Sequence, residues 1–141
     1  MELDRAIQIA CNVHMGKKDL AGKPYILHPL RVMLQMDTEL EMIIAVLHDV
    51  IEDGGSLEFH LARFSYKVVM TVETLSRRKG EPYEDYIKRV SKSRIATKVK
   101  LADLEDNLDP VRTAMLDPIK NEARREKYIL AHEYLIKNRR T

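Results

Sequence analysis

One stretch of the sequence, residues 45–55, constrains the fold more than any other. It reads AVLHDVIEDGG and continues an apolar run of the kind that soluble proteins bury. Four ionisable side chains interrupt this run, namely His48, Asp49, Glu52 and Asp53. Burying a carboxylate without a partner costs several kcal/mol, so the fold is expected to supply a compensating cation or a polar cavity here.

The flanking residues predict a helix that carries this stretch. Thr38 is the predicted N-cap, and Glu41 stands at the position that completes a capping box. Gly54 and Gly55 are typical of a helix end. The helix is therefore predicted to run through the apolar stretch to Asp53.

On such a helix His48 would face Glu52, and Asp49 would face Asp53, because residues four apart project together. Two adjacent stripes of metal-ligand-type groups would result. A solvated acidic helix end, with the histidine satisfied by its neighbours, is the alternative interpretation.

Helical spacing of apolar residues recurs along the rest of the chain. It is found in residues 3–13, 24–35, 83–90, 95–108 and 117–138. The segment VVMTVETL, residues 68–75, is rich in β-branched residues and would also suit a strand. No other segment offers it a pairing partner, so an all-α fold is predicted.

Length and charge narrow the class of protein. A chain of 141 residues predicts a single domain spanning 1–141. Its 24 basic and 22 acidic residues are too nearly balanced to indicate a nucleic-acid partner. Cys11 is the only cysteine, which excludes a disulfide framework and a thiolate zinc cluster. Because no signal-peptide or membrane-spanning pattern is present, a cytoplasmic protein without a membrane partner is predicted.

Two further residues complete a candidate metal site. His28 lies in an early turn of the predicted helix 24–35, and Asp103 lies in an apolar neighbourhood. If both converge with His48 and Asp49, two imidazoles and two carboxylates would surround one divalent ion, a set suited to manganese, iron or zinc. Such an ion activates bound water and gathers phosphate oxygens, which is the chemistry of phosphoester or pyrophosphate hydrolysis. A histidine satisfied within the core is the alternative for His28.

Other polar residues have candidate roles in the same reaction. Glu52 and Asp53 would orient or deprotonate the attacking water. Lys17 and Lys18 lie in the loop 16–23 and would meet the negative charge of a nucleotide substrate, although a lysine-rich loop is otherwise solvated surface.

Asn107 lies four residues after Asp103, so the two side chains are expected to project together. Glu105 and Asp106 are expected to face solvent. The segment SRRKGEP, residues 76–82, would either close over a cavity or simply join two helices.

Three segments of the sequence resemble the successive motifs of the HD-domain hydrolases. They are GKPYILHPL at 22–30, AVLHDVIEDG at 45–54 and KVKLADLEDNL at 98–108. The resemblance covers residues 6–108 and points in particular to the hydrolase domains of RelA/SpoT proteins and to the stand-alone small alarmone hydrolases. It implies an α-helical HD-domain bundle.

The resemblance also implies an activity and its residues. The implied reaction removes the 3′-pyrophosphate of guanosine tetra- or pentaphosphate and returns GDP or GTP. Manganese is the usual ion of the family, with the implied ligands His28, His48, Asp49 and Asp103. Glu52 and Asp53 match the acidic pair implicated in the chemistry, and Asn107 matches an asparagine of the nucleotide pocket.

The chain departs from the family pattern in two places. Asp19 and Leu20 stand where family members often carry a basic pair, and Leu104, Glu105 and Asp106 follow the LAD motif in place of a basic or aromatic stretch. Two other functions therefore stay open. One is hydrolysis of a different nucleotide, and the other is a non-catalytic module that binds a nucleotide or a partner helix and keeps the metal for stability.

Overall fold

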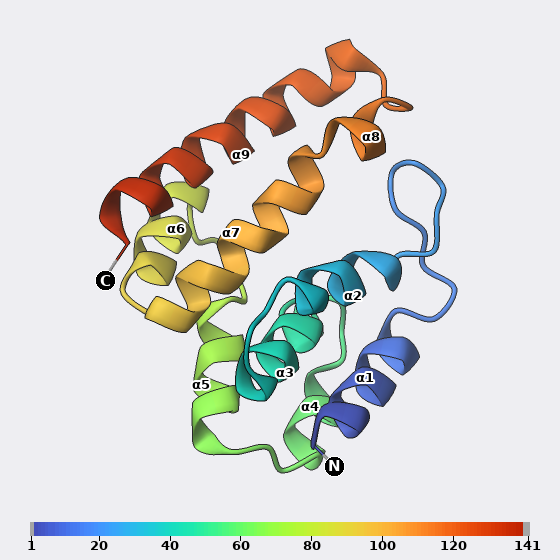
Figure 1. Cartoon of the computed structure of the whole chain (residues 1–141), viewed down its shortest axis with the longest axis vertical. Coiled ribbons are helices and arrows are strands. Elements are labelled where there is room, and N and C mark those ends of the chain that lie inside the picture. The colour runs from blue at the N-terminus through green and yellow to red at the C-terminus, as the bar shows by residue number, and fades with distance from the viewer. Residues whose placement is uncertain (1, 140–141) are drawn as a thin grey trace.

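The computed structural model describes residues 2–139 and folds them into α-helices (Figure 1). The helices are α1 (Glu2–Val13), α2 (Leu27–Leu34), α3 (Glu39–Leu47), α4 (Ser56–Leu61), α5 (Tyr66–Thr74), α6 (Tyr83–Ser91), α7 (Arg94–Leu108), α8 (Pro110–Thr113) and α9 (Pro118–Asn138). Over this range the only strand-like pairing is an isolated bridge between Lys18 and Pro24. The predicted all-α bundle is confirmed, and the segment 68–75 lies in helix α5 and the residue after it.

Helix α3 forms the centre of the core. It packs against α1, α2, α5 and α7, and its residues Ile44, Val46 and Leu47 are fully buried. Each such side chain contributes about 1.5–3 kcal/mol through removal of apolar surface from water. The apolar run in the sequence therefore lies where its composition predicts.

The start of α3 is as predicted, but its end is not. The Thr38 side chain accepts from the Glu41 backbone, and the Glu41 side chain accepts from the Thr38 backbone, so the capping box is present. The helix ends at Leu47 instead of Asp53, and residues 48–54 form consecutive turns. Three backbone hydrogen bonds in this segment join residues three apart instead of four apart, for example the bond of 3.1 Å from Val50 N to Leu47 O. The chain is therefore wound more tightly here than in an α-helix.

Two glycines fix the exit from these turns. Gly54 has a φ of +91°, a left-handed conformation that costs glycine nothing. Gly55 has no room for a side chain, because a Cβ there would lie 2.4 Å from Val13 Cγ2 and 2.7 Å from Val50 Cγ1. The turns formed by residues 48–54 are thereby held against helix α1.

Helices α7 and α9 lie side by side, with α6 against both and α8 joining them (Figure 1). The inner side of α9 is marked by the buried residues Ala131 and Leu135. Helix α7 also contacts α2 and α3, so residues from the two halves of the chain meet there. Within residues 2–139 no helix has both the length and the apolar character that crossing a lipid bilayer requires. That residues 1–141 form one domain stays a prediction.

Candidate metal centre

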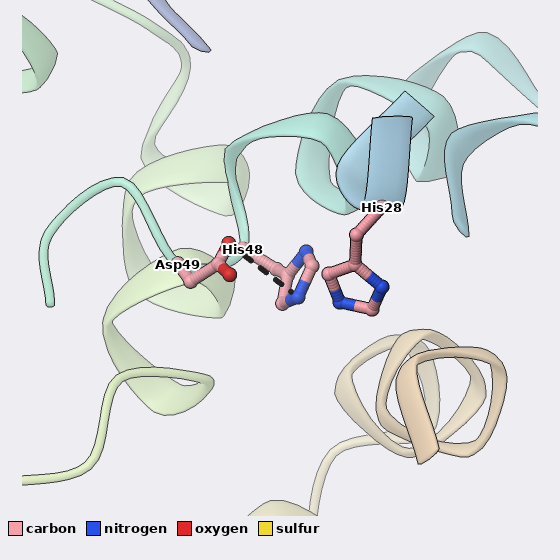
Figure 2. A group of neighbouring side chains, drawn as sticks. All are labelled: His28, His48 and Asp49. Carbon is pink, nitrogen blue, oxygen red and sulfur yellow. Dashed lines mark ion pairs between the residues drawn. The ribbon is translucent and has the colours of Figure 1, made fainter. Parts of the chain in front are cut away.

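Three of the predicted ligands converge. His28 comes from the first turn of α2, His48 is the C-cap residue directly after α3, and Asp49 follows it in the tight turns (Figure 2). One possible ligand atom from each lies within 4.8 Å of those of the other two. Both histidines are buried and Asp49 is nearly so, at 9% exposed. The early end of α3 thus places adjacent residues 48 and 49 at one site.

The hydrogen bond of His48 settles which ring nitrogen is free. Its Nδ1 lies 2.6 Å from the carbonyl oxygen of Ala45, and because a carbonyl only accepts, Nδ1 donates. A neutral His48 therefore has its lone pair on Nε2, which lies 3.5 Å from Asp49 Oδ1. This tautomer suits a metal ligand.

Asp49 offers the clearest sign that the site fits a cation. Its Oδ2 accepts a hydrogen bond from the Tyr25 hydroxyl, whereas its Oδ1 is buried without a hydrogen-bond partner. A buried carboxylate oxygen without a donor is costly, and a divalent ion between Asp49 and the histidines would satisfy it. The residues present therefore fit a metal.

Asp103 lies beside this group but is not a member of it. Its Oδ1 lies 2.8 Å from His28 Nε2 and 3.5 Å from His48 Nε2, and its Oδ2 accepts from Lys100 Nζ at 2.7 Å. Desolvation alone would raise the pKa of the Asp103 carboxyl, but Lys100, His48 and His28 together outweigh it and keep that pKa well below its usual range. Asp103 is thus an ionised, buried carboxylate directed at both imidazoles.

The carboxylates also act on the histidines. Burial alone would lower the pKa of His48, yet Asp49 and Asp103 outweigh burial and raise that pKa to about 9. For His28, burial is likewise outweighed by Asp103 and Asp106, and the pKa is raised. In the metal-free site the two rings therefore tend to carry protons that a metal would displace.

The two predicted catalytic carboxylates have different environments. Asp53 Oδ2 lies 2.6 Å from Lys17 Nζ and 3.0 Å from His14 Nδ1, and these neighbours outweigh desolvation and lower the Asp53 pKa. Glu52 accepts from the backbone N–H of Arg77, and desolvation raises its pKa although the residue as a whole is exposed. This hydrogen bond holds the basic segment 76–82 next to Glu52, one of the two predicted catalytic carboxylates.

A small basic cavity lies beside the metal-ligand group. It has a volume of about 190 Å³ and is lined in part by Lys17, Lys18, Asn107, Arg112 and Arg124. The predicted nucleotide-binding residues thus share one cavity. Asn107 also donates to Asp103 Oδ1 at 3.1 Å, which links the cavity to the predicted ligands.

Several polar residues at the site were missed by sequence reasoning. The expectation that Asp106 faces solvent is wrong: only 11% of its side chain is exposed, and it contacts His28, Arg31 and Arg112. Its spacing of three from Asp103 was a signal, since residues i and i+3 share a helical face. Glu105 is exposed, as expected.

Asp19, which departs from the family pattern, has a structural role. Its Oδ1 accepts from the backbone N–H groups of Ala21 and Lys23, and its Oδ2 lies 3.2 Å from Arg112 Nη2. No spacing in the sequence indicated Arg112, because it reaches this loop across 93 residues.

A larger cavity of about 820 Å³ lies between α2, α7 and α9. Its lining includes Arg31 and Asp106 but none of the four predicted metal ligands. The chemistry of the side chains, and not cavity size, identifies the candidate site.

No family model matches the sequence. The chain is 35% identical over 123 residues to the guanosine-3′,5′-bis(diphosphate) 3′-pyrophosphohydrolase of Aquifex aeolicus and 32% identical over 124 residues to that of Vibrio cholerae. Each match covers 79% of this chain and 18% of the relative, so the chain spans less than a fifth of the length of these relatives. A solved structure described as a metazoan ortholog of SpoT that hydrolyzes ppGpp matches with a TM-score of 0.78 and 25% identity, over 97% of this chain and 84% of that one.

Proposed function

We propose that this chain, which is RelA/SpoT hydrolase-like in sequence and in fold, is a metal-dependent hydrolase that removes the 3′-pyrophosphate of guanosine tetra- or pentaphosphate. The observation that carries the proposal is the convergence of His28, His48 and Asp49 around an unpartnered buried carboxylate oxygen. The names of the two curated relatives and of the solved structure support the choice of substrate.

His28, His48, Asp49 and Asp103 would hold the ion. Two imidazoles and two carboxylates form a mixed nitrogen and oxygen donor set, which supports manganese over calcium or a thiolate-bound metal. When bound, the ion would lower the pKa of a water molecule and draw the phosphate oxygens of the substrate toward it.

The different environments of Glu52 and Asp53 support different roles. Asp53, whose pKa is lowered by Lys17 and His14, stays a carboxylate and would orient the attacking water by accepting one of its protons in a hydrogen bond. Glu52, whose pKa is raised, is better suited to take the other proton as the water oxygen attacks phosphorus. The bond from the 3′ oxygen to phosphorus would break, the 3′ oxygen would take a proton from solvent to become a hydroxyl, and pyrophosphate carrying the water oxygen would be released.

The basic cavity would bind another part of the nucleotide. At about 190 Å³ it is smaller than the roughly 300–1,000 Å³ of pockets that enclose a whole ligand, so it suits one phosphorylated end. Lys18 and Arg124 supply positive charge there, and Arg112 occupies the region where Asp19 and Leu20 replace the basic pair of the family. The balanced net charge of +2 favours such a small-molecule substrate over a nucleic acid, and the single cysteine fits a cytoplasmic setting.

The test is a hydrolysis assay of the purified chain with guanosine tetraphosphate, with manganese and with chelator, and with products separated by chromatography. Manganese-dependent release of GDP and pyrophosphate is expected. Asp49→Ala is expected to abolish it, whereas Asp37→Ala, which removes a carboxylate that is 80% exposed and paired with Lys98, should retain it.

Two other outcomes would change the proposal. An intact alarmone beside cleavage of a different nucleotide would keep the metal chemistry and replace the substrate. A chain that binds manganese yet cleaves no nucleotide in a broad panel would be a binding module.

A further inference from the structure

Asp106 closes a polar network between helices α2, α7 and α8. Its Oδ2 lies 2.6 Å from His28 Nδ1 and accepts from Arg112 Nη1 at 2.7 Å. Its Oδ1 accepts from Arg31 Nε at 2.8 Å, and Arg31 Nη2 reaches Oδ2 at 3.2 Å. The carboxylate, on α7, therefore has donors from two other helices, α2 and α8.

The imidazole of His28 lies between two carboxylates. Nε2 faces Asp103 on the metal side, and Nδ1 faces Asp106 on the opposite side. A ring held at one nitrogen has its tautomer and its orientation fixed, which leaves the other nitrogen directed at the metal. We infer that Asp106 is a positioning residue for the metal centre, holding His28 through Nδ1 so that Nε2 points at the ion.

The surroundings of Asp106 suit this role. Desolvation would raise the pKa of Asp106, but His28 and Arg31 outweigh it and hold that pKa at about 2, so the carboxylate is ionised at neutral pH. Arg112 Nη1 donates at 2.7 Å to Oδ2, the oxygen that faces His28, so this oxygen keeps a cationic donor that does not depend on Arg31. An ionised acceptor also makes the imidazole a stronger electron donor at its other nitrogen.

The competing explanation is a purely structural one, in which Asp106 only links α2 to α7 through Arg31. The chain offers a matched control, because Arg31 contacts Asp106 without contacting any predicted metal ligand. Arg31→Gln removes the ion pair between the helices and keeps the bond from His28 to Asp106. Asp106→Asn keeps the side-chain volume and removes the negative charge that faces both His28 and Arg31.

The experiment is calorimetric titration of the full chain and the two variants with manganese, together with urea unfolding of the metal-free proteins. The inference rests on the proposed metal site. We expect Asp106→Asn to weaken manganese binding about tenfold or more. Arg31→Gln should bind manganese within about twofold of the parent, although its free energy of unfolding should also fall because the ion pair with Asp106 is lost.

Binding by Asp106→Asn within twofold of the parent would overturn the inference while leaving the metal site in place. Equal weakening in Arg31→Gln would also overturn it in favour of the structural explanation. If the parent binds no manganese, the metal site fails and the inference fails with it.

A second measurement needs no variant and is independent of activity. In the chain labelled with ¹⁵N-histidine and loaded with diamagnetic zinc, His28 is expected to carry its proton on Nδ1. A proton on Nε2 of His28 in that spectrum would overturn the inference.

Discussion

Raising the pH is predicted to destabilise the metal-free chain and, at the same time, to strengthen its binding of metal. Both effects arise at the buried histidines. The pKa of His48 is raised to about 9, because Asp49 and Asp103 outweigh the desolvation that would lower it, and the pKa of His28 is raised as well. Protonated rings beside ionised carboxylates stabilise the fold, and neutral rings are required by a metal.

The magnitude follows from His48. A group whose pKa is raised by folding contributes stability that is complete below its unfolded pKa and is lost as the pH rises through its folded pKa. For His48 this window extends from 6.5 to about 9, and the residue is only 4% exposed, so solvent screening is small. At about 1.4 kcal/mol for each pKa unit, the metal-free chain should lose about 3 kcal/mol across this window.

Metal binding should change in the opposite direction. Below the folded pKa values, each histidine proton that the ion displaces weakens binding about tenfold for each unit by which the pH falls. With His28 and His48 both protonated, the dependence should approach a hundredfold for each unit. The stabilisation by metal therefore grows as the pH rises, while the metal-free fold weakens.

The assay is urea unfolding of the chelator-treated chain between pH 6 and 9.5, with manganese titrations at pH 6, 7 and 8. His60→Asn is the matched control, because His60 is exposed and lies outside the site, and it should leave both profiles unchanged. Metal-free stability that stays constant or rises from pH 6.5 to 9 would refute the charge balance described for His48. Manganese affinity that is the same at pH 6 and 8 would refute the histidines as ligands.

Three further predictions concern single residues. Gly55→Ala should lower the free energy of unfolding by about 1–3 kcal/mol in urea titrations, because its Cβ would press on Val13 and Val50, and an unchanged midpoint would contradict the close packing. Lys100→Met should cost about 3–5 kcal/mol by leaving Asp103 buried without its cation, and a smaller loss with manganese present would show that the metal replaces that charge. Glu52→Gln should lower kcat by about 10²–10⁴-fold with manganese affinity unchanged, whereas full activity in the variant would remove Glu52 from the proton transfer.

The periodicity of apolar residues was sufficient to predict the all-α fold. The side chains of Thr38 and Glu41 each accept from the backbone N–H of the other residue, three positions away, so local rules described their capping box correctly. The end of the same helix was placed six residues too late. Tight turns after Leu47 are stabilised by packing of Gly55 against α1, which is a tertiary contact that helical spacing does not contain.

In the candidate site, too, the sequence indicated residues that are close in the chain but missed contacts of Asp106 that only folding creates. His48 and Asp49 are neighbours in sequence and were predicted from the charges inside an apolar run. Asp106 follows Asp103 by three residues on the same helix, but its main partners His28 and Arg31 lie 78 and 75 residues away in the sequence. The sequence pattern predicted that Asp106 faces solvent, because only folding brings Nδ1 of His28 and the side chains of Arg31 and Arg112 to that face of α7.

The hydrogen bonds from His28 to Asp103 and Asp106 close loops of 75 and 78 residues, more than half of the 141-residue chain. Closing a loop of that length costs chain entropy before any contact can compensate for it. In a chain in which α7 and α2 are not yet in contact, only His48 and Asp49 would lie together, and an ion would bind these two ligands weakly. The complete donor set exists only when α7 is docked on α2, so full metal affinity requires this long-range contact and the bound ion stabilises it in return.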